Sequence, residues 1–387
     1  MVDANRRKVL KGLGIAGVTG GLAGCLGDDD SSDDAGGTAG GTGSTDDGTG
    51  STDASGGESS DNWPEFTVDN PQFPQIWSTL VDHQYELGLE QDLDQMEAQE
   101  EAHYGQSPAP TPDDESEWLE PDPIEFAYFP AENPATYADS LDPLLENIED
   151  ETGHEVNYAS INSYAAQIEA MRSERLHLAA FASGPTPYGV NLANFVPVAI
   201  QAADGTFGYR LWVVTQADND EINELSDIAG KNVVHTEETS NSGNLAPNAL
   251  FAQEGVVPGE DYDIEFSGSH ENSGLGVYMG DYDAAPVCST CVQRVIDDGR
   301  IDANDLKVVW SSDPFPEGSF GYINNLHPDL QEGFRNALFE YDYSGTSIPE
   351  DFNGRDVFLE IDYNTVWHQN LVIQEANDIE YETGDLD

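Results

Sequence analysis

The stretch Thr239-Ser240-Asn241-Ser242-Gly243-Asn244-Leu245-Ala246-Pro247 joins two segments of different periodicity. Asn232-Val233-Val234-His235, just before it, is short and β-branched, which predicts a buried strand. The apolar positions after it predict a helix that starts near Asn244 and ends at Gly255. The unit is therefore a strand, a small polar turn and a helix N-terminus, as in α/β domains.

This turn has two interpretations. The first turn of a helix offers free N–H groups and a partial positive charge, and Gly243 keeps side-chain bulk away, so a tetrahedral oxyanion fits there with Ser240 and Ser242 as hydroxyl donors. Alternatively, Ser242 and Asn244 simply cap the helix. The GxxxxGK[ST] pattern is absent and no lysine follows, which argues against nucleotide hydrolysis.

The composition is strongly acidic. The 387 residues include 75 acidic and 13 basic side chains, for a formal charge of −62. Such a chain is a poor partner for nucleic acid or an anionic membrane surface. The acids are dispersed among periodic apolar runs rather than gathered in one block, which indicates a folded protein adapted to molar salt.

The N-terminal region predicts export and anchoring. Arg6-Arg7 precedes a short apolar stretch, as in twin-arginine signals, and Leu22-Ala23-Gly24-Cys25 resembles a lipobox in which Cys25 is lipidated. We assign residues 1–27 to this signal. Residues 28–61 are almost wholly Gly, Ser, Thr, Asp and Ala and predict a disordered acidic tether. The expected location is the outer face of the cell membrane, as in a haloarchaeal-type lipoprotein.

Strands alternating with helices from Ile124 onward predict a largely parallel α/β sheet. We expect residues 62–121 to form a partly helical extension, 122–217 a first lobe, 218–308 a second lobe, and 309–387 a return to the first lobe with C-terminal helices. Two α/β lobes joined by more than one crossing strand indicate a hinged cleft, a type II periplasmic-binding-protein-like fold. Because parallel strands present binding groups at their carboxyl ends, Tyr164 and the Ser183–Tyr188 loop are candidate ligand contacts.

With these elements placed, the sequence resembles the substrate-binding proteins of phosphonate, phosphite and phosphate ABC transporters. Several motifs carry the resemblance in the family's order, from about Ile124 to Tyr341: Tyr164–Met171, Ser183-Gly184-Pro185 with Tyr188, Gly208-Tyr209, Leu225–Lys231, Ser240–Pro247, His270 and Gly280–Ala285. Asn241 departs from the family's usual threonine, and Glu237 or Glu238 stands where the family has aspartate. The region before Pro121 has no counterpart.

The resemblance implies an extracellular receptor that captures a phosphonate or related phosphorus oxyanion and hands it to a permease driven by an ATPase. It implies that Tyr164, Tyr188, Ser240, Asn241, Ser242, Gly243 and His270 bind the oxyanion, His270 being the one group that can add a formal positive charge, and that Asp283 meets a ligand amine. We expect no catalytic residue, metal or cofactor. We expect the protein to be a monomer. The same fold binding phosphate or a sulfonate remains an alternative.

Two other classes of protein were weighed. A secreted hydrolase needs a base near Ser240 or Ser242, and His270 or His235 is conceivable, but no G-x-S-x-G or HExxH motif supports it. A structural surface-layer role leaves the cradle and the aromatic residues without purpose. Cys288-Ser289-Thr290-Cys291 is a C-x-x-C pair, for which a local disulfide or inert thiols are favoured over redox catalysis, and a zinc site lacks two ligands.

Overall fold

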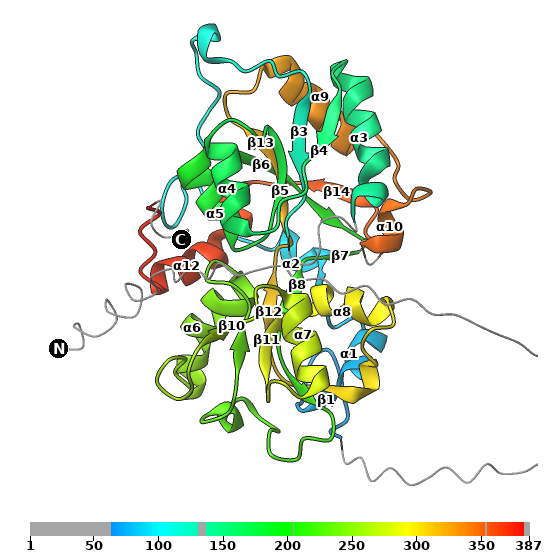
Figure 1. The fold of residues 1–387 in the computed structure, drawn as a ribbon, viewed down its shortest axis with the longest axis vertical. Helices are drawn as coiled ribbons and strands as arrows, with labels where there is room; N and C mark the ends of the chain where they lie inside the picture. Colours follow the sequence, from blue (N-terminus) through cyan, green and yellow to red (C-terminus); the bar gives the residue numbers. More distant parts are fainter. Residues whose placement is uncertain (1–62, 131–136, 204, 353, 383–387) are drawn as a thin grey trace, which may run out of the picture. The chain divides into compact units, whose positions relative to one another are not determined.

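The computed structural model describes residues 63–130, 137–203, 205–352 and 354–382. The predicted signal, Cys25 and the whole tether lie outside these residues. Residues 60–387 form one compact unit, in which a mixed sheet and an antiparallel sheet each carry their own covering helices (Figure 1). Each sheet forms the centre of one lobe, as the sequence predicted.

The first lobe has a six-stranded sheet in the order β14-β6-β13-β5-β3-β4. Its strands are β3 (Ile124–Ala127), β4 (Val156–Tyr158), β5 (Leu178–Phe181), β6 (Phe195–Ala202), β13 (Ser319–Ile323) and β14 (Val357–Glu360). Only β3, β4 and β5 pair in parallel, whereas β13 is antiparallel to both β5 and β6 and β14 is antiparallel to β6. The expected parallel sheet is therefore a mixed one, because β13 and β14 enter after the chain has visited the second lobe.

Helices cover both faces of this sheet (Figure 1). They are α3 (Ala138–Thr152), α4 (Tyr164–Arg172), α5 (Pro185–Ala193) and α9 (Pro328–Phe339). The apolar face of α3 is buried, and the helix ends at Gly153, whose φ of 72° suits a residue without a side chain. Ser163 caps α4 by accepting the N–H of Ala166 at 3.2 Å, as its position predicted.

The second lobe has a four-stranded sheet in the order β1-β12-β8-β11. These strands are β1 (Gln75–Ile76), β8 (Tyr209–Gln216), β11 (Ala285–Cys288) and β12 (Leu306–Phe315). A parallel pair, β9 (Val234–His235) and β10 (Glu265–Phe266), joins β11 through a bridge between Val233 and Ala284. Helices α6 (Ala246–Leu250), α7 (His270–Met279) and α8 (Ser289–Asp297) belong to this lobe.

The boundary between the lobes differs from the predicted one. We expected the first lobe to run to residue 217, but β8 pairs with β11 and β12 in the second sheet. The chain thus crosses from the first lobe to the second before Tyr209, and it returns to the first lobe after Phe315. Periodicity identifies β8 as a buried strand but carries no information about which sheet it joins.

The N-terminal extension is part of both lobes. It contains α1 (Trp77–Asp82), β2 (Gly88–Leu89), which pairs with β7 (Thr206–Phe207), and α2 (Glu90–Asp94). Trp77 is fully buried, with its ring edge-on to Trp212 at 4.6 Å, in the core of the second lobe. Further along, the N–H of Gln106 donates to Asn191 on α5 of the first lobe. The described part of this extension, residues 63–121, is therefore integral to the body.

The C-terminal segment adds α10 (Ile348–Asp351), α11 (Tyr363–Val366) and α12 (His368–Ala376) to the first lobe. The sequence predicted one helix over about 365–376, and the structure divides it at Trp367. Within the described ranges, no helix has the length and apolar character needed to cross a membrane.

Candidate ligand-binding site

The cradle, residues Ser240–Gly243, opens a continuous helical stretch. Asn241–Leu245 forms a wide turn that leads into α6 and a 3₁₀ turn ending at Gly255. The helix begins at Asn241, before the predicted start, because the Ser240 hydroxyl accepts the N–H of Gly243 at 3.2 Å. A Cβ on Gly243 would lie only 2.3 Å from the Thr236 hydroxyl, so the turn packs against Thr236 only with glycine.

His270, the first residue of α7, orients the cradle. Burial, together with the charge of Arg294, lowers the pKa of His270 to about 3, so the ring is neutral. Its Nδ1 lies 3.2 Å from the N–H of Cys288, which only donates. Nδ1 is therefore the unprotonated nitrogen.

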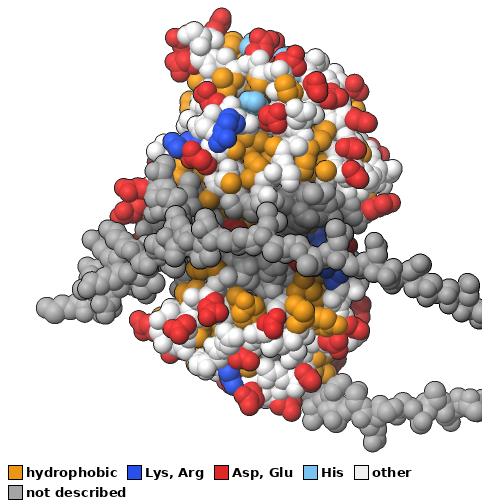
Figure 2. All heavy atoms as spheres, viewed as in Figure 1, with side chains coloured by type: hydrophobic (Ala, Val, Ile, Leu, Met, Phe, Trp, Pro, Cys, Tyr) orange, Lys and Arg blue, Asp and Glu red, His pale blue; other side chains and the backbone are white. Residues whose placement is uncertain are grey.

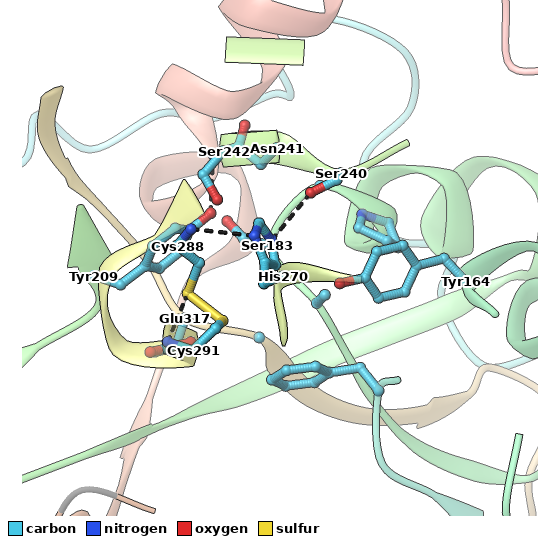
Figure 3. A pocket seen from close by; sticks show the side chains of 15 residues that line it. Tyr164, Ser183, Tyr209, Ser240, Asn241, Ser242, His270, Cys288, Cys291 and Glu317 are labelled. Atoms are coloured by element: carbon cyan, nitrogen blue, oxygen red, sulfur yellow. Dashed lines mark hydrogen bonds between the residues drawn. A yellow bond between two sulfur atoms is a disulfide. The ribbon is translucent and has the colours of Figure 1, made fainter. Parts of the chain in front are cut away.

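The proton of this ring therefore sits on Nε2, 3.2 Å from the Ser240 hydroxyl (Figure 3). Ser240 accepts from Nε2–H and from the N–H of Gly243, which leaves its own O–H to donate into the pocket. The imidazolium that the sequence allowed is absent, and His270 acts on Ser240 as a neutral donor.

Two more hydroxyl groups lie beside Ser240. Ser242 Oγ is buried and has no well-formed hydrogen bond within the described residues, although it is near the Tyr209 hydroxyl. Asn241 donates its amide to that Tyr209 hydroxyl at 3.1 Å. Burial raises the pKa of Tyr209 to about 12, so it keeps its proton and remains a donor. Tyr209 was recognised in a motif but not predicted as a ligand contact.

The opposite wall of the pocket comes from the first lobe. Ser183 and Gly184 follow β5, and Tyr164 starts α4 with its hydroxyl turned toward the pocket (Figure 3). Three side chains of the C-terminal region hold this wall: Trp367 Nε1 donates to the Ser183 carbonyl, Asn370 Nδ2 to the Ser183 hydroxyl, and Gln374 Nε2 to the Gly184 carbonyl, each at 2.8 Å. No sequence pattern predicted these contacts, because each joins residues about half the chain apart.

The two walls touch directly. A Cβ on Gly184 would lie 2.4 Å from the Thr239 carbonyl oxygen and 2.5 Å from the Asn241 nitrogen across the cleft. Glu237, also on the second lobe, accepts the N–H of Tyr164 in the first lobe, and burial raises the pKa of Glu237 to about 7. The lobes are therefore closed on each other at this point.

Three predicted ligand contacts are absent from the pocket wall: Gly243, which packs against Thr236 within the cradle, Tyr188 and Asp283. Tyr188 is buried within α5, which begins at Pro185 where a loop was expected, and its ring packs edge-on against Tyr381 at 5.4 Å. Asp283 precedes β11, and its carboxylate accepts the N–H of Asn232 at 2.9 Å. The pocket lies at the other end of β11, beside Cys288, so Asp283 is at the wrong end of the strand to meet a ligand.

The floor of the pocket contains the cysteine pair, for which the sequence favoured a local disulfide or inert thiols without placing it at the site. Cys288 and Cys291 form a disulfide at the start of α8. Beside it lies Glu317, between β12 and β13 (Figure 3). Glu317 is paired with Arg355 at 2.5 Å and accepts from Thr290 at 2.8 Å. An isolated glutamate after a proline offers no sequence signal for this role.

The pocket is small and lacks a cation on its wall. Its fifteen lining residues enclose about 300 Å³ of space, open solvent included, and none of them is Lys or Arg. They are Phe129, Tyr164, Ala182, Ser183, Gly184, Pro185, Tyr209, Ser240, Asn241, Ser242, His270, Cys288, Cys291, Glu317 and Gly318. Among the described residues no group of three or more His, Cys, Asp or Glu is placed to hold a metal ion.

Two α/β lobes with a small pocket between them are typical of solute-binding proteins. Comparison with known proteins narrows the class. The model of the family described as "ABC transporter, phosphonate, periplasmic substrate-binding protein" matches residues 126–366. The chain belongs to this family, whose members are substrate-binding components of transporters and not enzymes.

Individual relatives agree with this assignment. The phosphate-import protein PhnD of Mycolicibacterium smegmatis is 35% identical over 60% of this chain and 75% of its own length. The binding protein of a Pseudomonas aeruginosa ABC phosphonate transporter has a TM-score of 0.60 at 22% identity, covering 67% of this chain and 88% of its own. PhnD1 of Prochlorococcus marinus, solved with methylphosphonate, has a TM-score of 0.60 at 18% identity, covering 67% and 99%. The two structures show the fold.

Proposed function

We propose that this chain captures a phosphonate or a closely related phosphorus oxyanion in the closed pocket and delivers it to an ABC permease. The observation that carries the proposal is the pair of cradle hydroxyls. Ser240 has its proton left to donate, and Ser242 Oγ is buried near the Tyr209 hydroxyl with no well-formed hydrogen bond among the described residues. An oxyanion supplies the acceptors that such donors require. Tyr209 and Tyr164 add hydroxyl groups on the remaining sides.

The absence of Lys and Arg from the described wall does not weaken this proposal. Neutral donors fixed in position bind an anion without reorganisation, and their strength rises in a site from which water is excluded. The formal charge of −62 acts over a short range in molar salt, where the Debye length is about 3 Å at 1 M. Groups in direct contact with the ligand therefore decide its affinity.

Calorimetric titration of the body in molar salt tests the proposal, with methylphosphonate, phosphite, phosphate and a sulfonate as ligands. The expected result is tight binding of a phosphorus oxyanion that falls at least 100-fold in the Ser240→Ala, Ser242→Ala double variant. Ser344→Ala, an exposed serine far from the pocket, is the matched control. Binding that survives the double variant, or no binding across the phosphorus ligands, contradicts the proposal.

Phosphate is the second candidate, because the M. smegmatis relative is named a phosphate-import protein. Its fourth oxygen requires a partner beyond the three oxygens that a phosphonate presents. Direct competition between phosphate and methylphosphonate in the same calorimetric cell ranks the two, and a higher affinity for phosphate would assign the protein to phosphate import.

We further propose that the protein is attached to the outer face of the membrane through a lipid on Cys25 and works in molar salt. The signal, lipobox and tether support the anchor. Dispersed acidic side chains, visible over the face in Figure 2, support the salt adaptation. Full-length protein should fractionate with membranes and Cys25→Ala protein should not; equal fractionation of both removes the lipid anchor.

A further inference from the structure

The pocket wall contains one acidic side chain among its fifteen described residues, Glu317. A ligand that carried an ammonium group would need a carboxylate with unbalanced negative charge, because a buried cation without such a partner is strongly disfavoured. The charge state around Glu317 therefore determines which substituents the pocket accepts.

The charge of the Glu317 carboxylate is already balanced by the protein. Its Oε1 accepts from the Arg355 guanidinium at 2.5 Å and from the Thr290 hydroxyl at 2.8 Å. The Glu317 and Arg355 side chains are only 7% and 3% exposed, so solvent screens the pair weakly. The pair has no net charge, and a ligand ammonium would compete with a guanidinium that is fixed in place.

Arg355 is held in this position by contacts with β6 and with the residue just before β8. Its guanidinium also reaches the Gly208 carbonyl at 3.4 Å, and its own carbonyl accepts from Gln201 at 3.0 Å. Glu86 is a second acid near Arg355, but it is not part of the pocket wall, and burial raises the pKa of Glu86 to about 7. Glu317 is thus the partner that Arg355 neutralises at the pocket.

The remaining surroundings also disfavour a cation. Arg294 lies near enough for its charge to lower the pKa of His270. The wall beside Glu317 is apolar, formed by the Cys288–Cys291 disulfide and by Phe129. A hydrogen atom or short alkyl group matches this wall, whereas an ammonium group would lose its hydration there.

We infer that the pocket selects phosphorus oxyanions with a small uncharged substituent and rejects those with an aminoalkyl group, because Arg355 occupies the only carboxylate on the described wall. This inference rests on the proposed function, and it revises the sequence expectation that an acid would meet a ligand amine.

A size-matched pair of ligands tests the inference. Propylphosphonate and 2-aminoethylphosphonate have the same number of non-hydrogen atoms and differ in a terminal methyl or ammonium group. Calorimetry on the wild-type body in molar salt at pH 7.5 should give at least tenfold tighter binding of propylphosphonate, with methylphosphonate tighter still. Equal or tighter binding of 2-aminoethylphosphonate overturns the inference while leaving the proposed function intact. No binding of any phosphorus ligand overturns both.

Arg355→Met then tests the cause. This variant leaves the Glu317 carboxylate without its guanidinium partner, so the preference for propylphosphonate over 2-aminoethylphosphonate should fall at least tenfold or reverse. Adding Glu317→Gln to Arg355→Met should cancel the improved binding of 2-aminoethylphosphonate. Arg172→Met, which removes an exposed arginine on α4, is the control and should leave the preference unchanged. An unchanged preference in folded Arg355→Met protein overturns the assigned cause. The wild-type ratio decides the selectivity even if Arg355→Met does not fold.

Discussion

The two walls of the pocket are built in different ways. The cradle of the second lobe is organised mainly by its own neighbourhood: Ser240 caps the turn, Gly243 packs on Thr236, and His270 belongs to the same lobe. The Ser183–Gly184 wall of the first lobe is held from the C-terminal region by Trp367, Asn370 and Gln374. A locally built wall can be recognised in a sequence, whereas a wall held from a distance cannot.

Gly243→Ala should have the largest effect, because residue 243 lies where the cradle packs most closely against Thr236. The added Cβ would collide with Thr236, and overpacking of this kind costs about 1–3 kcal/mol of stability. We expect ligand binding to be lost and the melting temperature to fall. Gly345→Ala, where nothing lies within 4 Å of the new Cβ, is the control. Normal affinity in Gly243→Ala would show that the cradle is not the binding element.

Gly184→Ala should weaken binding without destabilising either wall. Its Cβ would meet the Thr239 carbonyl and the Asn241 nitrogen only when the lobes are closed, so the open form is unaffected. We expect a loss of affinity of about 30-fold or more, about 2 kcal/mol, with little change in the melting temperature of the unliganded protein. Small-angle scattering that shows ligand-induced compaction equal to wild type would contradict this expectation.

Asn370→Ala tests the wall that is held from a distance. It removes one buried hydrogen bond to the Ser183 hydroxyl, worth about 1 kcal/mol, so affinity should fall about five- to tenfold. The cradle should remain intact. Amide hydrogen-exchange rates equal to those of the wild type in the second-lobe residues would verify this. Asn336→Ala on α9 is the matched control, and an affinity loss of the same size there would remove the specificity of the effect.

The last effect concerns stability rather than affinity, and it depends on pH at the contact between the lobes. The folded-state pKa of Glu237, about 7, lies above its unfolded value of 4.5, so this carboxyl favours folding at low pH and its contribution is lost as pH rises through 7. Glu237→Gln keeps an acceptor for Tyr164 and does not ionise. It should raise stability at pH 8 by about 1–2 kcal/mol, after reduction for partial exposure, and leave it unchanged near pH 4.5. A pH-independent difference in melting temperature would rule out this titration.

Residues whose role depends on local turn chemistry were predicted from the sequence. Ser240, Ser242 and Gly243 sit in a strand, turn and helix unit whose geometry the chain spacing determines, and the structure brings Tyr164 and His270 to them. The two-lobed α/β fold was predicted from the alternation of strands and helices. The antiparallel pairing of β13 and β14 with β6 was not, because it depends on the return of the chain from the second lobe to the first.

The differences between the predicted and the observed pocket walls share a physical cause. Asp283 was chosen because it adjoins a strand, but the pocket lies at the carboxyl end of β11 and Asp283 lies before its start. Tyr188 was assigned to a loop that is in fact the first turn of α5. Glu317 was missed because its importance comes from its pairing with Arg355, a contact between segments that no spacing rule connects.

The contacts of α12 also have a consequence for biosynthesis. Ser183 and Gly184 are translated well before the side chains that hold them, Asn370 and Gln374, which follow 187 and 190 residues later. This wall of the pocket therefore cannot take its final form until the ribosome has passed Gln374. Both central sheets are translated before that point, so removal of α12 would affect ligand capture before it removed either lobe.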